Sequence, residues 1–238
     1  MFQWLSAHTI PNHQKTTRRF SVGSNFYFGG GSVKSNHKKN LLALVEGAMM
    51  LALAWVVDYV CALAPYNGIL FPAGGSITVG MLPLVYYAYR HGIAWGIGAG
   101  LVFSGLQIAM GWYAPPAGTW WAFMLCVLLD YVIAFTVMGI APLFAKPFEN
   151  KKRILRLTGY GLGAVIVCVL RYLSSVLSGG ILWGVYAPES MNPWVYSLAY
   201  NAGYMLPNAI LTGILAVLLC RAMDPLTLRP MKKGRQEA

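Results

Sequence analysis

Three carboxylates interrupt the long apolar segments of this 238-residue chain, and they are the side chains best suited to hold a polar or cationic ligand. Glu46 and Asp58 fall in the first apolar segment, and Asp130 falls in the fourth. At about 1.5 Å of helix rise per residue, Asp130 lies roughly 15 Å from the nearer end of its segment, close to the middle of a membrane. A charge at that depth is costly, so Asp130 needs a partner or a function.

Arg171 is the one basic residue placed well inside an apolar segment, at a depth similar to that of Asp130. The first interpretation is a structural ion pair between the two side chains. The second is that Asp130 helps to hold a polar or cationic ligand. The two are compatible if Arg171 orients the carboxylate, so the sequence leaves both open.

Aromatic side chains crowd the outer half of the apolar segments, on the outer side of Asp130 and next to it in the sequence. They comprise Tyr131, Trp183, Tyr196, Tyr200 and Tyr204, with the amide Asn201 beside the last three. Aromatic belts are ordinary at membrane interfaces and account for Trp120, Trp194 and Tyr186. An aromatic box next to a carboxylate is instead suited to a flat cation, which it binds through cation–π contact.

These residues have to be positioned by six apolar segments, each predicted to be a membrane helix. The segments are 41–64, 77–89, 92–111, 120–144, 156–181 and 196–220. All Lys and Arg residues except Arg171 lie outside the segments or at their ends: before the first segment, after the second, after the fourth and after the last. Cytoplasmic loops carry the positive charge. We therefore predict an all-α, polytopic plasma-membrane protein: a six-transmembrane-helix bundle with both termini cytoplasmic. Glu46 then lies near the cytoplasmic face, and Asp58 near the outer end.

Composition excludes several classes of function. The chain is 57% hydrophobic and 11% charged, whereas soluble domains carry about 25% charged residues. The net charge of +11 follows the topology and forms no single basic stripe, so no nucleic-acid partner is expected. No histidine falls in an apolar segment and no CxxC occurs, so neither a catalytic dyad nor a metal or cofactor site is expected. No phosphate-binding loop occurs either, so the chain is not an ATPase.

The chain divides into three parts. Residues 1–40 are polar and lack the apolar stretch of a signal peptide, so we expect a disordered cytoplasmic extension. Residues 41–221 form the membrane domain, and 222–238 form a basic cytoplasmic tail. Within the domain, the Gly- and Pro-rich loop 65–76 either folds over a cavity as a lid or is an ordinary external loop.

The first apolar segment carries a face of small residues, with Ala48 and Ala52 one helical turn apart. Small side chains let membrane helices approach closely. This face is a candidate docking surface for a second membrane protein.

Several separated strings resemble one family. They are EGAMMLALA (46–54), GSITVGMLPLVYYAYRHG (75–92), LLDYVIAF (128–135), LRYLSSVLSGGILWGVYAPES (170–190) and PWVYSLAYN (193–201). In this order they resemble the thiamine-specific substrate-binding subunit of energy-coupling-factor vitamin transporters. The resemblance covers about residues 41–221. It implies a six-helix bundle that binds thiamine near the outer face and has no ATPase of its own. A separate membrane scaffold and two ATPase subunits would act in trans, and Ala48 and Ala52 match the family's scaffold-docking face.

The resemblance also implies which residues bind the ligand. The family's binding positions fall on Asp130, Tyr131, Trp183, Tyr196 and Asn201, and another pocket aromatic is expected near Trp120. One departure stands out. A position that is commonly histidine in the family is Ser175 here, so one hydrogen bond to the ligand is lost or passes through water.

Two alternatives stay open at this stage. The same scaffold could bind another small vitamin or a thiamine precursor. The chain could also be a self-contained secondary transporter, although no internal repeat is visible in the sequence.

Overall fold

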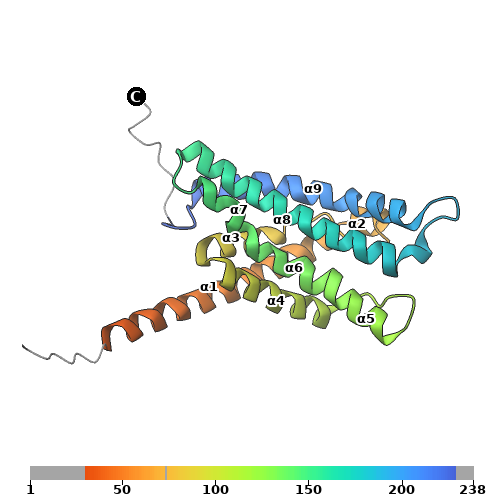
Figure 1. Ribbon diagram of the computed structural model, residues 1–238, viewed down its shortest axis with the longest axis horizontal. Coiled ribbons are helices and arrows are strands. Elements are labelled where there is room, and N and C mark those ends of the chain that lie inside the picture. Colours follow the sequence, from red (N-terminus) through yellow and green to blue (C-terminus); the bar gives the residue numbers. More distant parts are fainter. Residues whose placement is uncertain (1–29, 73, 229–238) are drawn as a thin grey trace, which may run out of the picture.

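The computed structural model describes residues 30–72 and 74–228, which form a bundle of helices along one axis (Figure 1). This part of the chain contains helices and no strand, so the predicted all-α class is confirmed. The α-helices are α1 Gly30–Ala62, α2 Pro65–Leu70, α3 Met81–His91, α4 Ile93–Met110, α5 Trp120–Cys126, α6 Ala134–Thr136, α7 Ala141–Ala145, α8 Arg153–Leu182 and α9 Pro193–Ala222. Four short helices of other types join them: η1 Val127–Ile133, η2 Val137–Ile140, η3 Lys146–Phe148 and η4 Gly184–Tyr186.

Five stretches of the described chain are long and apolar enough to cross a membrane. They are His37–Ala62, Ile93–Met110, Trp120–Phe148, Arg153–Leu182 and Pro193–Ala222. The second of the six predicted segments also forms a helix, but α3 has only 11 residues. At 1.5 Å per residue it rises about 17 Å, short of the roughly 30 Å hydrocarbon core. The residues before it are non-helical, and Gly74 and Gly75 adopt positive φ angles of 101° and 95°.

The boundaries of the predicted extension and tail are only partly visible. Helix α1 begins at Gly30, before the predicted start at residue 41, while residues 1–29 lie outside the described part of the chain. Of the predicted tail, residues 223–228 are described and lie against the bundle, where Tyr86 donates to the carbonyl of Met223.

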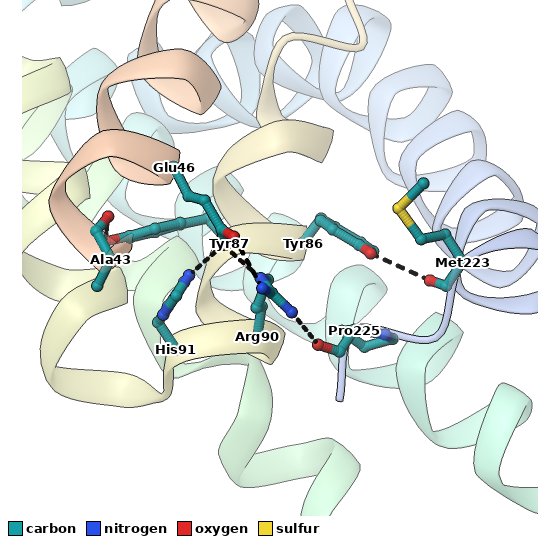
Figure 2. Close-up of polar contacts among 8 residues, drawn as sticks. All are labelled: Ala43, Glu46, Tyr86, Tyr87, Arg90, His91, Met223 and Pro225. Carbon is teal, nitrogen blue, oxygen red and sulfur yellow. Dashed lines mark hydrogen bonds and ion pairs between the residues drawn. The ribbon is translucent and has the colours of Figure 1, made fainter. Parts of the chain in front are cut away.

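One end of the bundle is held together by a cluster around Glu46 (Figure 2). The Arg90 guanidinium donates to both oxygens of Glu46, and His91 Nε2 lies 2.6 Å from Oε2. Arg90 also donates to the carbonyl of Pro225 at 3.2 Å. The cluster therefore joins α1, the end of α3 and the segment after α9, so the basic ends of these segments meet at one end of the bundle.

The long helices pack closely because small residues face each other. Helices α8 and α9 lie side by side, and α4 lies against the middle of the Trp120–Phe148 span (Figure 1). In the second contact, Gly139 meets the backbone of Gly96 and Ile97, and Gly100 faces the backbone of Phe135. A side chain at either position would force the two helices apart.

We predict that Gly139→Ala lowers the free energy of unfolding by about 1–3 kcal/mol, because its Cβ would collide with the α4 backbone. Thermal unfolding of the purified protein in detergent measures this. The matched control is Gly98→Ala on α4, where a Cβ meets nothing within 4 Å. A control that loses as much stability as Gly139→Ala would contradict close helix packing as the cause.

Candidate ligand-binding cavity

A cavity of about 390 Å³ lies among the helices, lined on α1 by Asp58 and Ala62, toward the end of that helix that lies beyond Glu46. Its walls come from the last turns of α1 and α4, from the 65–80 segment, from η1 and from the facing ends of α8 and α9. Its polar and aromatic lining includes Asp58, Phe71, Gln107, Tyr113, Asp130, Tyr131, Arg171, Ser175, Trp183, Tyr186, Tyr196, Tyr200, Asn201 and Tyr204. Six of the seven predicted binding residues are therefore brought together.

Asp130 is held by neutral hydrogen-bond donors. Its Oδ2 accepts bonds from Ser178 Oγ at 2.5 Å and from the Trp183 indole at 3.4 Å, and the Cys126 thiol donates at 3.6 Å. Among the described residues no hydrogen bond falls on Oδ1. The protein thus holds this cavity-lining carboxylate through one oxygen and leaves the other without a hydrogen bond from the described residues.

Asp130 and Tyr131 lie in η1, which is a π-helix. This wider helix type is rare and recurs at functional sites. Here two adjacent side chains, Asp130 and Tyr131, both line the cavity. Backbone groups at membrane depth must be satisfied internally. Accordingly, Ser174 donates to the carbonyl of Leu129 at 2.7 Å, and Ser104 donates to that of Tyr131 at 2.9 Å.

Arg171 lines the same cavity without pairing with Asp130. Its guanidinium carbon lies 4.3 Å from the centroid of the Phe135 ring, a cation–π contact. The ion pairs of the described chain join Glu46 to Arg90 and His91, and Arg156 to Asp224. The structural ion pair considered for Arg171 and Asp130 is therefore wrong. Similar depth on two helices does not fix the direction in which each side chain points.

A row of tyrosines on α9 forms one aromatic wall. The rings of Tyr196 and Tyr200 lie 5.7 Å apart, and those of Tyr200 and Tyr204 lie 6.4 Å apart. At the mouth, Trp183 stacks on Tyr186 with 6.1 Å between centroids. The four-residue spacing seen in the sequence thus places these tyrosines on the cavity side of α9.

Asn201 is buried and organises the neighbouring polar groups. It donates to the carbonyl of Ser197 at 2.9 Å and to that of Ser175 at 3.4 Å, and it accepts a bond from the Tyr204 hydroxyl at 2.6 Å. Trp120, by contrast, is 77% exposed, stacks on Trp121 and does not line the cavity.

Residues of the 65–80 segment on both sides of position 73 line the cavity and contact α9, and the lid interpretation stays a prediction. The Phe71 ring meets those of Tyr200 and Tyr204 edge-on, at 6.0 and 5.4 Å. The Tyr200 hydroxyl donates to the carbonyl of Gly74 at 2.9 Å. Gly75 has to be glycine, since a Cβ there would lie 2.6 Å from the Tyr204 ring.

Two buried amides tie the same segment to the bundle. Asn208 accepts a bond from the Thr78 backbone at 2.8 Å and donates to the Ser76 carbonyl at 2.9 Å. Asn67 donates to the Cys61 carbonyl at 2.7 Å and accepts one from the backbone of Ile77 at 2.9 Å. These bonds replace the water that irregular backbone would otherwise need.

Sequence reasoning missed one polar pair in the lining. Gln107 donates to Asp58 Oδ2 at 2.7 Å. Asp58 stood out as an acid in an apolar segment, and Gln107 is the one amide in a glycine-rich apolar segment. Each residue was visible as a polar side chain in an apolar segment, but the sequence offered no reason to expect that the two would form a hydrogen bond. No group of three or more His, Cys, Asp or Glu side chains in the described part of the chain could hold a metal.

The fold and cavity can now be set beside known proteins. The protein-family model described as "Thiamine transporter protein (Thia_YuaJ)" matches residues 44–228. The chain belongs to this family. It is 33% identical over 189 residues to thiamine transporter ThiT of Bacillus subtilis, covering 77% of this chain and 93% of that protein. It is 28% identical over 190 residues to thiamine transporter ThiT of Lacticaseibacillus paracasei, covering 76% and 88%.

A solved structure supports the fold independently. The structure of ThiT from Listeria monocytogenes superposes with a TM-score of 0.61 at 23% identity, covering 76% of this chain and 94% of that chain. Members of this family transport rather than catalyse. The chain is accordingly a multi-pass plasma-membrane transport protein and not an enzyme.

We predict that Asn208→Ala loosens the 65–80 segment. The change leaves the Thr78 N–H and the Ser76 carbonyl unpaired, and each buried unpaired group costs about 1–3 kcal/mol. Hydrogen exchange at residues 74–80, followed by mass spectrometry, should be at least about tenfold faster. Leu206→Ala removes an exposed side chain of the same helix and should leave that exchange unchanged.

Proposed function

We propose that the chain is the thiamine-binding subunit of an energy-coupling-factor uptake transporter, and that it captures thiamine in the cavity at its outer end. The named relatives are thiamine transporters, which supports thiamine as the substrate. The observation that carries the proposal is the charge of the cavity lining. Two carboxyl side chains, Asp58 and Asp130, and one guanidinium, Arg171, line the cavity, which gives the lining a formal net charge of minus one.

This charge is not neutralised within the protein. The hydrogen bonds to the two carboxylates come from Gln107, Ser178, Trp183 and Cys126, all neutral side chains. A carboxylate at membrane depth gains most from a cation, because charge interactions are strong where water is excluded. Thiamine, with one fixed positive charge, supplies that cation.

The shape and chemistry of the walls fit a small ligand with two flat rings. A volume of about 390 Å³ lies at the lower end of the range for small-molecule sites. Trp183, Tyr196 and Tyr131 line the cavity, and aromatic rings of this kind can stack on a heteroaromatic ring or attract its charge. We assign Asp130, Tyr131, Trp183, Tyr196 and Asn201 to ligand contact, with Ser175 beside Asn201.

Energy for uptake comes from other subunits in this proposal. The sequence holds no phosphate-binding loop, so ATP hydrolysis falls to two ATPases that act through a membrane scaffold. Ala48 and Ala52 are exposed on α1, on the part of the helix that follows Glu46. An exposed small-residue face is what close packing against a scaffold helix requires.

Asp130→Asn should weaken thiamine binding roughly 10- to 150-fold, because losing a charge-assisted hydrogen bond costs about 1.5–3 kcal/mol. Isothermal titration calorimetry on the purified protein measures this. Ser178→Ala is the matched control: it removes a donor to Asp130 and keeps the charge, so its loss should be smaller. A wild-type protein that binds no thiamine refutes the proposed substrate, and unchanged affinity in Asp130→Asn refutes the assigned contact.

Ala48→Trp and Ala52→Trp should block assembly with the scaffold and abolish uptake while thiamine affinity stays intact. Co-purification with scaffold and ATPases, and uptake by cells, measure the first two properties. Leu53→Trp enlarges another exposed residue of α1 and should assemble normally. A variant that loses thiamine binding along with assembly would place the alanine face inside the bundle and contradict the docking role.

A further inference from the structure

The Asp58–Gln107 pair is a second polar site in the cavity lining, separate from the polar site around Asp130. Asp58 comes from α1 and Gln107 from α4, whereas Asp130 and its donor Ser178 come from η1 and α8. The Gln107 amide donates to Asp58 Oδ2, and among the described residues no hydrogen bond falls on Oδ1. Each carboxylate is thus fixed through one oxygen by a neutral donor.

The backbone around Asp58 is shaped to keep its side chain in place. Gly80, at the start of α3, lies so close that a Cβ there would be 2.9 Å from the Asp58 Cβ and 2.9 Å from the Ala54 carbonyl oxygen. No basic side chain in the described chain forms an ion pair with Asp58. Asp58 is therefore a partly buried carboxylate in the cavity lining that has a neutral donor and no cationic partner.

We infer that Asp58, positioned by Gln107, is a second ligand-binding carboxylate, and that it makes the cavity select free thiamine over its phosphate esters. This inference rests on the proposed function. The physical reason is charge. A phosphate monoester carries about −1.5 to −2 at pH 7, so esterification reverses the sign of the ligand's net charge.

Both carboxylates repel an anionic ligand, and Arg171 is the one cationic side chain among the described residues of the cavity lining that attracts it. The Arg171 guanidinium is already engaged over the Phe135 ring. Asp130 is needed to bind thiamine itself. Asp58 therefore supplies the extra negative charge that moves the lining from neutral to minus one.

The test compares thiamine with thiamine monophosphate by calorimetry on the purified full-length protein. The measured quantity is the ratio of the two dissociation constants. In Asp58→Asn, thiamine should bind more weakly and the ratio should fall at least about tenfold, because the repulsion acts where water is excluded. Glu189→Gln removes an exposed acid of the outer loop that does not line the cavity, so it should leave the ratio unchanged.

A second variant lowers the negative charge at this position without changing Asp58. Gln107→Lys keeps Asp58 and places a cation against it, so the ratio should fall as in Asp58→Asn. If either variant binds thiamine with the wild-type ratio, the inference is overturned while the proposed function stands. If the wild-type protein fails to bind thiamine, the proposed function fails first. Should Asp58→Asn not fold, Gln107→Lys decides alone.

Discussion

A carboxylate inside a membrane bundle has to be solvated by the protein, and the architecture around Asp130 follows from this constraint. The hydroxyl of Ser178 and the indole of Trp183 stand in for water at one oxygen. The π-helical turn that carries Asp130 exposes carbonyl groups, which Ser104 and Ser174 then satisfy. None of these donors is charged and no structural ion pair occupies Asp130 among the described residues, so its carboxyl group stays available to a ligand.

The same requirement shapes the 65–80 segment, where regular helix gives way to an irregular path. Here amide side chains take the place of water. Asn67 and Asn208 each bind one N–H and one carbonyl of the backbone and so fix the segment against α1 and α9. Phe71 supplies the apolar contact with the tyrosine row. The segment is thus joined to the bundle by a few specific bonds rather than by a broad packed surface.

Depth along the membrane was predictable from the sequence, but direction around each helix was not. Charges mark the helix ends and rise per residue is constant, so residue spacing was enough to place Asp130 and Trp183 toward the same end of the bundle. Residue spacing placed Arg171 correctly along the bundle axis but paired it wrongly with Asp130. Its actual contact is with the Phe135 ring, and this contact depends on how the helix is rotated about its axis. Asp58 and Gln107 lie 49 residues apart, and only helix packing brings them together. Trp120 failed to join the cavity because it opens its helix on the exposed side.

The short length of α3 has a consequence for the path that a ligand would follow. The cavity is lined by residues that immediately precede this helix, and α3 then continues to Arg90 in the cluster at the other end of the bundle. Its tyrosines Tyr86, Tyr87 and Tyr89 are all buried in the bundle, and none of them lines the cavity. If the proposed uptake function holds, a ligand bound in this cavity meets packed side chains on the α3 side, so its release past α3 requires the helices to move.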